Sequence, residues 1–281
     1  MKRVASVLIP IFAAVLPACS DPVAPVDFSK YERSVFSQHG EDGVIEKIFE
    51  LIEPTHRYAV EFGAGNGIRN NNTRNLMLNK GWRGLQIEGD PERAAEARAA
   101  FADLPQVKVL EAWVYPGNIE TLFEDNGVPL DFDLLVIDID SNDYYIWKVI
   151  HKFRPKVVEI EINPFFPPPQ LMVIKFHPLN FWDHTDYSGA SIASMIKLGK
   201  EKGYEPLYVP DGGFNLFFVD QRYFDRFGIA DNSPAALYKT ANAEAEHYFN
   251  RDPHGRGEVP FEDPYLDFGH VKIKKEFLFD R

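Results

Sequence analysis

The sequence predicts an α/β fold in which a mainly parallel sheet is covered by helices on both faces and ends in an antiparallel hairpin. Short runs rich in Val, Ile and Leu alternate with segments of helical period through much of the chain, the pattern of a parallel sheet whose strands are buried on both sides. Two β-rich runs at 205–209 and 215–220 are joined by "PDGGF", and an Asp-Gly pair is typical of a hairpin turn.

The expected elements follow one another in a regular order. Apolar residues at helical spacing predict a helix over 40–54, which ends at Pro54. Pro91 stands at the start of the strongest helical segment. Strands are expected at 57–63, 83–90, 106–114, 131–140, 155–163, 205–209 and 215–220, and the further helices at 72–81, 91–104, 119–127, 144–153 and 191–204.

Length, composition and charge set the limits. A chain of 281 residues is long enough for one large α/β domain or two small ones. Its 45% apolar and 26% charged residues are those of an ordinary globular protein. The net charge of −12 argues against broad binding to nucleic acid, because neutralising phosphates requires clustered Lys and Arg.

The N-terminus has the pattern of a secretory signal. Lys2 and Arg3 precede a short apolar run that ends in "LPAC", which is too short to span a bilayer comfortably. "LPAC" resembles a bacterial lipobox, although Pro17 departs from it, and Cys19 stands where the lipidated cysteine would be. We therefore expect a signal peptide over 1–18, a linker over 19–35, a main domain over 36–224 and a helical or irregular extension over 225–281.

Cys19 is also the only cysteine of the chain. A single cysteine excludes a disulfide framework within the chain and any zinc site built from several cysteines. The alternative to lipidation is that Cys19 is a buried or incidental residue. If Cys19 carries lipid, we expect a protein anchored to a bacterial membrane, facing the periplasm or the cell surface.

The stretch "RYAVEFGAGNG" leads a short apolar strand into three glycines, Gly63, Gly65 and Gly67. A strand, a glycine turn and a helix start form a site for an anion or a nucleoside. The spacing departs from the G-x-G-x-x-G of dinucleotide-binding folds. Glu88 ends the next strand about 20 residues later, where such folds place the carboxylate that binds the ribose hydroxyls.

Glu61, two residues before Gly63, separates the ligands that the loop could hold. A carboxylate beside the glycines would repel a pyrophosphate, whereas it would attract the ammonium and sulfonium groups of S-adenosylmethionine (SAM). Three interpretations remain open at this point: a methyl-donor site, a dinucleotide site, and a tight turn without a ligand.

From about Phe36 to Val219, the chain resembles the FkbM-type methyltransferases, which are class I SAM-dependent enzymes. The segments that carry this resemblance are "FSQHGEDGVIEKIF", "YAVEFGAGNG", "NTRNLMLNKGWRGLQIEGD", "LLVIDIDSNDYYIWKVI", "PKVVEIEINPFFPP", "DYSGASIASMIKLGKEKGY" and "GGFNLFFV". The resemblance implies a Rossmann-like, seven-stranded sheet with one reversed strand, a SAM site in its crevice, and methyl transfer to an oxygen of a sugar or small metabolite.

The same resemblance implies a role for individual residues. Glu61 and the three glycines would line the methionine end of SAM, Glu88 would bind the ribose, and Glu111 and Ala112 would lie near the adenine. The segment "SQHGED" would close over the cofactor, with Gln38, Glu41 and Asp42 as polar contacts.

A second cluster of acids follows a buried strand. "VIDIDSNDYYIW" places Asp138, Asp140 and Asp143 at a strand end, where open α/β sheets build their sites. Transfer to a hydroxyl needs a group that takes its proton, so Asp140 and Asp143 are the catalytic candidates, while Asp138 could contact the cofactor. Asp143 is alternatively a helix-capping residue.

Metal binding and a histidine base are two further alternatives for this region. Asp138, Asp140 and Glu161 could hold Mg²⁺ or Mn²⁺, which prefer oxygen ligands, although SAM is the only cofactor that we expect. His184, in the aromatic loop "FHPLNFWDHTDYSGAS", could act as a general base near neutral pH. The alternative for this loop is aromatic packing with solvated polar groups.

The predicted function is SAM-dependent O-methylation of a hydroxyl on a glycan or small metabolite. The alternatives are an exported lipoprotein that keeps the fold as a ligand-binding module and, more distantly, a nucleotide-sugar transferase. Export conflicts with a cytosolic cofactor. Either the protein begins near Val26 and is cytoplasmic, or it is exported and binds another ligand, or it meets SAM by a route that the sequence does not reveal.

Overall fold

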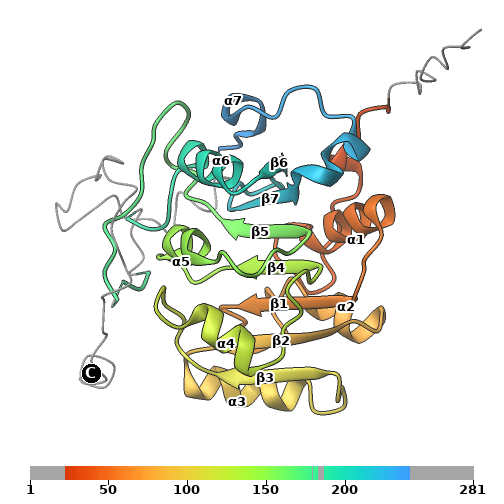
Figure 1. Cartoon of the computed structure of the whole chain (residues 1–281), viewed down its shortest axis with the longest axis vertical. Coiled ribbons are helices and arrows are strands. Elements are labelled where there is room, and N and C mark those ends of the chain that lie inside the picture. Colours follow the sequence, from red (N-terminus) through yellow and green to blue (C-terminus); the bar gives the residue numbers. More distant parts are fainter. Residues whose placement is uncertain (1–22, 179, 183–186, 241–281) are drawn as a thin grey trace, which may run out of the picture.

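The computed structural model describes residues 23–178, 180–182 and 187–240, which contain a seven-stranded sheet (Figure 1). The strand order is β3-β2-β1-β4-β5-β7-β6; β7 pairs antiparallel with both β5 and β6, and the other neighbouring strands are parallel. The strands are β1 Tyr58–Phe62, β2 Arg83–Glu88, β3 Val107–Glu111, β4 Leu134–Ile137, β5 Val157–Glu161, β6 Tyr204–Tyr208 and β7 Asn215–Asp220. The predicted Rossmann-like sheet with its C-terminal antiparallel hairpin is confirmed.

Helices cover both faces of this sheet. They are α1 Glu41–Ile52, α2 Arg74–Asn79, α3 Pro91–Ala100, α4 Ile119–Asp125, α5 Asp143–Val149, α6 Ile192–Glu201 and α7 Pro234–Leu237, with 3-10 turns η1 Phe28–Lys30 and η2 Gln221–Phe227. Side chains of α4, α5 and α6 pack in one apolar core, and those of α1 and α2 pack in the other. Each helix and strand predicted from the sequence is present.

Alternation along β1 assigns its side chains to the two cores. Val60 and Phe62 belong to the core under α4, α5 and α6, whereas Ala59 belongs to the core under α1 and α2. Successive side chains of a strand point to opposite faces. Glu61 therefore points to the same face as Ala59, towards α1 and α2, a placement that matters for the site below.

The segment predicted as a linker packs partly against the domain. Phe28 is 2% exposed and its ring lies 5.5 Å from that of Tyr208 and 5.9 Å from that of Phe227, measured between centroids. Val26 N donates to Phe227 O. The structured region thus begins before residue 36 and continues past 224, because these two segments bury each other's aromatic side chains.

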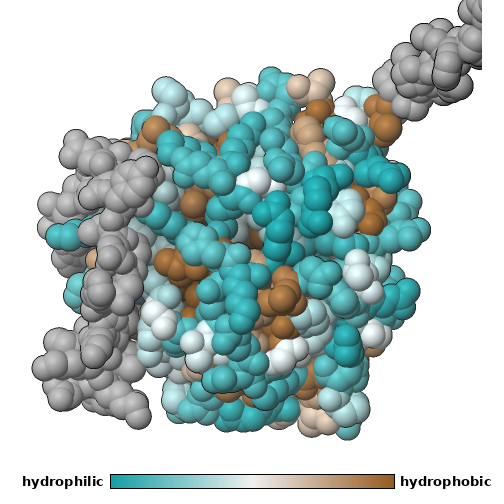
Figure 2. All heavy atoms as spheres, in the orientation of Figure 1, coloured by the Kyte–Doolittle hydropathy of each residue, from teal (hydrophilic) through white to brown (hydrophobic). Residues whose placement is uncertain are grey.

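One face of the molecule, shown in Figure 2, is largely polar. On the face shown in Figure 2, hydrophilic side chains prevail and apolar ones lie in small scattered groups, as on most globular proteins. In the part of the chain that the structure describes, no helix has the length and apolar character needed to cross a membrane. Cys19 and the predicted signal lie outside the described residues.

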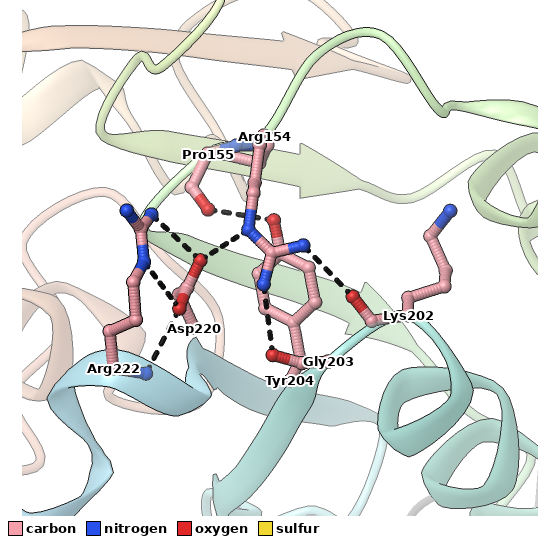
Figure 3. Close-up of polar contacts among 7 residues, drawn as sticks. All are labelled: Arg154, Pro155, Lys202, Gly203, Tyr204, Asp220 and Arg222. Atoms are coloured by element: carbon pink, nitrogen blue, oxygen red, sulfur yellow. Dashed lines mark hydrogen bonds and ion pairs between the residues drawn. The ribbon is translucent and has the colours of Figure 1, made fainter.

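An ion-pair network fastens the antiparallel hairpin to the rest of the sheet (Figure 3). Arg154 Nε donates to Asp220 Oδ2 at 2.6 Å, and its other nitrogens donate to Lys202 O and Gly203 O. Although burial opposes it, hydrogen bonds from Arg222 and Arg154 hold the pKa of Asp220 below its usual value. The network lies where β5 begins and β7 ends, at the opposite end of the sheet from the cavity described next.

Candidate functional site

A cavity of about 890 Å³ runs along the carboxyl ends of the parallel strands. Parallel sheets of this kind bind ligands outside these ends, at the point where the strand order reverses. Here that point lies between β1 and β4, and the cavity extends from the end of β3 to the start of β7. Its volume is in the upper part of the range of about 300–1,000 Å³ found for small-molecule sites.

The glycine loop after β1 forms one wall of the cavity, and its glycine N–H groups already have acceptors. Gly65 has φ +55°, and a Cβ there would meet no atom within 4 Å, so the loop faces open space at this position. Four N–H groups of the loop donate to protein acceptors at N···O distances of 2.7–3.2 Å: Gly63 and Ala64 to Ile87 O, Gly65 to Glu88 Oε2, and Gly67 to Ala64 O.

The other two glycines serve packing rather than a ligand. A Cβ on Gly63 would lie 1.5 Å from Asp138 O, so this glycine lets β1 approach the end of β4. A Cβ on Gly67 would lie 2.7 Å from the ring of Phe101, which follows α3. Gly63 and Gly65 line the cavity, whereas Gly67 does not. The predicted role of Gly67 at the methionine end is therefore wrong.

Glu88, at the end of β2, is a cavity residue as predicted. Its side chain is 7% exposed, Oε2 accepts from Gly65 N at 2.7 Å and Oε1 accepts from Asp90 N at 2.8 Å. Each carboxylate oxygen has two lone pairs. Glu88 can therefore hold the glycine loop and still accept hydrogen bonds from two neighbouring hydroxyl groups.

Glu61 does not contribute to the cavity, which corrects the prediction that it binds the methionine end. It is 2% exposed on the α1 and α2 face of the sheet, where Oε1 accepts from Asn72 N and Oε2 accepts from Thr73 N and Thr73 Oγ1 at 2.9, 3.1 and 2.6 Å. Burial raises its pKa to about 7, against the lowering effect of these hydrogen bonds. The alternation of β1 sends it away from the ligand.

At the end of β3, one of the two predicted residues lines the cavity. Ala112 does so together with Trp113, whose ring lies so close to Gly89 that a Cβ there would meet it at 2.4 Å. Glu111 instead points outwards and pairs with Arg98 at 3.1 Å. The prediction for Glu111 is wrong, since a one-residue step along a strand reverses the direction of the side chain.

Three carboxylates meet in the middle of the cavity. Asp138 and Asp140 follow β4, Glu161 ends β5, and one oxygen of each lies within 4.8 Å of one oxygen of the others. Burial, and then the charge of Asp140, raises the pKa of Asp138, while burial and the charge of Asp138 raise that of Glu161. All three residues line the cavity.

The backbone around Asp140 is held in an unusual conformation. Asp140 has φ +61°, which is uncommon for a residue other than glycine and costs roughly 1–3 kcal/mol. Asp143 stabilises this turn by bonding the backbone on both sides of Asp140: Oδ1 accepts from Ile139 N at 2.8 Å and Oδ2 accepts from Ser141 N at 3.0 Å. Asp143 is fully buried and does not line the cavity, so its predicted catalytic role is wrong.

The segment before α1 forms the wall near β7. Gln38 and His39 line the cavity, and His39 Nε2 is buried without a hydrogen-bond partner among the described residues. Glu41 and Asp42 are buried instead: Glu41 accepts from His39 N and Asn215 Nδ2, and Asp42 Oδ2 accepts from the N–H groups of Val35, Phe36 and Ser37. Of the three polar contacts predicted for this segment, only Gln38 reaches the cavity.

Several cavity residues were not predicted from the sequence. His39 stands in the quoted "SQHGED", but nothing in the sequence indicated that its ring would stack on Phe214, with centroids 5.8 Å apart. Trp113 falls within the strand predicted over 106–114, and Asn142 stands in the quoted "VIDIDSNDYYIW". An aromatic residue near the carboxyl end of a predicted strand was the available signal for Trp113. His184, a catalytic candidate, lies outside the described residues.

No family model and no curated protein matches the chain. Solved structures with a similar fold include the CurJ carbon methyltransferase (12% identity, TM-score 0.44, 64% of this chain and 52% of that chain), the N-terminal domain of EvdMO1 in the presence of SAH and D-fucose (16%, 0.42, 64% and 82%), and an S-adenosylmethionine-dependent methyltransferase from Clostridium acetobutylicum (14%, 0.40, 69% and 92%). The chain thus spans about half the length of CurJ. At these identities the likeness concerns the fold alone.

Proposed function

We propose that the chain is a SAM-dependent methyltransferase acting on a hydroxyl group. The observation that carries the proposal is the polarity of the cavity. The described cavity lining contains six carboxylate residues, Glu88, Asp90, Glu96, Asp138, Asp140 and Glu161, against two arginines and one histidine. A lining of this composition favours a cationic ligand and disfavours a phosphate-bearing one.

The glycine loop supports the same choice. Loops that bind phosphate present unpaired backbone N–H groups to the ligand, whereas Gly63, Gly65 and Gly67 all donate within the protein. Six residues lie between Gly67 and Arg74, the first residue of α2, so no helix N-terminus follows the turn directly. SAM, with its sulfonium and ammonium groups, needs neither unpaired N–H groups nor a helix N-terminus. The choice of SAM over a phosphate-bearing ligand therefore does not depend on Glu61.

The residues present fit such a donor. Glu88 would bind the ribose hydroxyls, the open space at Gly65 would accommodate the chain of the donor, and Ala112 and Trp113 would flank the base. When bound, SAM supplies an electrophilic methyl group. We assign to Asp140, the most exposed of the three clustered carboxylates, the role of accepting the hydroxyl proton. The acceptor class we propose is a glycan or a small hydroxylated metabolite.

Isothermal titration with SAM tests this function on the purified chain and two variants. Glu88→Gln replaces one carboxylate oxygen of Glu88, which accepts from Gly65 N and Asp90 N and would accept from the ribose hydroxyls, by an NH₂ group. A hydrogen bond to a charged group is worth about 1.5–3 kcal/mol, so we expect SAM binding to weaken at least about tenfold. Glu111→Gln, on the neighbouring strand end but outside the cavity, is the matched control and keeps its affinity. No SAM binding at millimolar concentration by the folded protein would contradict the proposal.

Two alternatives from the sequence have their own tests. A nucleotide-sugar transferase would bind a sugar nucleotide in the presence of Mn²⁺ and would not bind SAM. For attachment, we propose a lipid on Cys19, on the strength of the N-terminal pattern alone. Labelled palmitate should be incorporated by the wild type and not by Cys19→Ala. A lipidated protein without SAM affinity would favour the exported ligand-binding module.

A further inference from the structure

The cluster of Asp138, Asp140 and Glu161 has a geometry that suits a cation. Two oxygens bound to one ion lie at most twice the metal–oxygen distance apart, which is about 4.2 Å for Mg²⁺ and about 4.6–5.2 Å for Ca²⁺. The three protein oxygens lie within 4.8 Å of one another. The bound on the oxygen–oxygen distances is close to these limits, so a divalent ion could be held after small side-chain movements.

Two buried acceptors in the cavity wall, one on Glu161 and one on Asn142, receive no hydrogen bond from the described residues. Glu161 Oε2 is inaccessible to solvent and has no partner there, and the same holds for Asn142 Oδ1. Asn142 is 7% exposed and lines the same cavity, on the loop that carries Asp138 and Asp140. Its Nδ2 donates to His177 O at 3.0 Å, which orients the amide and leaves Oδ1 as an acceptor. Buried acceptors without a partner are unfavourable, and a cation would satisfy them.

The charge balance points in the same direction. Among the described residues neither Asp138 nor Glu161 takes part in an ion pair, although basic side chains elsewhere in the domain are paired with acids. Asp143 adds a further buried acid next to the loop. Carboxylates this close to one another repel, and a bound positive ion would offset their charge.

We propose that Asp138, Asp140 and Glu161 bind one divalent cation, with Asn142 as an additional oxygen donor within the same wall of the cavity. Oxygen ligands select hard ions such as Mg²⁺, Ca²⁺ and Mn²⁺. Of the six positions typical of Mg²⁺ or Mn²⁺, three or four would be filled by protein, and the rest are open to water or to a ligand.

This cation would define the acceptor class, an inference that rests on the proposed methyltransferase function. An ion with two open positions binds two neighbouring oxygens of one molecule better than a single one, and it makes a bound hydroxyl more acidic. The acceptor expected is a molecule with adjacent oxygen functions, such as a vicinal diol of a sugar. Because a carboxylate has two oxygens, Asp140 can serve as a ligand and still accept a proton.

Mn²⁺ binding to the purified full chain, followed by electron paramagnetic resonance of the free ion, tests the site without any assay of activity. We expect one ion per chain. Asp138→Asn and Glu161→Gln should each weaken binding at least about tenfold, while Glu96→Gln, an acid of the same cavity but on α3, should bind as the wild type does. Thermal unfolding of each variant establishes that it is folded.

The outcomes separate the cation site from the proposed function. Absence of Mn²⁺ binding at millimolar concentration, or unchanged binding by folded Glu161→Gln, overturns the cation site, and SAM titration of the same samples reports on the methyltransferase function independently. SAM binding without Mn²⁺ binding would contradict only the cation site. Mn²⁺ binding without SAM binding would support the cation site and contradict the proposed function.

Discussion

Glycines of one motif have different tasks in this protein. Gly63 lets two strand ends approach, Gly65 faces the cavity, and Gly67 packs on α3. At Gly63 the obstacle to a side chain is backbone, because an added Cβ would lie 1.5 Å from Asp138 O, whereas at Gly65 it would meet no atom within 4 Å. The sequence pattern makes them look equivalent, but only the folded chain distinguishes them.

This difference predicts unequal effects of one substitution. Gly65→Ala places alanine at φ +55° in open space and should cost about 1–2 kcal/mol of unfolding free energy. Gly63→Ala must also displace the end of β4, and we expect a loss of more than about 3 kcal/mol or failure to fold. Urea unfolding of both variants measures the difference, and equal losses would contradict the assignment.

Some cavity residues could be predicted from the sequence and others could not. Glu88 and Asp140 were predicted as cavity residues because strand ends of a parallel sheet meet at one edge. Glu61 was misassigned, although its place between Val60 and Phe62 already implied that it faces away from them. The tasks of Asp143 and His39 depend on Ile139 N, Ser141 N and Phe214, contacts that no local pattern contains.

Among the elements, the reversed strand β7 ends in a network of polar contacts. It lies between β5 and β6, and Asp220 at its end receives Arg154 from the segment before β5 and Arg222 from η2 (Figure 3). The helices and strands themselves were predictable, because apolar periodicity and the Gly, Pro and Asp residues of turns and helix ends specify them locally. The network was not, since Arg154 and Asp220 are far apart in the chain.

Arg154→Met should therefore lower the unfolding free energy by about 2 kcal/mol, because Asp220 loses a charged partner while buried and two carbonyl groups lose their donors. Lys152→Met is the matched control. Its ion pair with Glu124 is half exposed on both sides, so the loss should stay below about 1 kcal/mol. Urea unfolding at neutral pH compares the two, and similar losses would contradict a special role for the network.

Across the whole molecule, buried carboxylates set the response of stability to pH. The pKa of Glu61 is about 7 in the folded protein against 4.5 for a free glutamate. The folded state therefore holds this proton more tightly, and its contribution to stability is lost as pH rises from about 4.5 to about 7. Buried Glu159, whose pKa burial also raises, acts with the same sign.

We expect the wild type to be more stable at pH 5 than at pH 8, with Glu61 contributing up to about 3 kcal/mol of the difference. Glu61→Gln should reduce this difference, because the amide does not titrate. Asp125→Asn, at an exposed position, should leave it unchanged. Urea unfolding in the presence of a chelator at both pH values measures the effect, and an undiminished difference in Glu61→Gln would refute it.

The internal hydrogen bonds of the glycine loop do not require a ligand. The glycine N–H groups all have acceptors within the protein, so these groups need no ligand to complete their hydrogen bonds. We therefore expect the glycine loop to be folded before SAM is added.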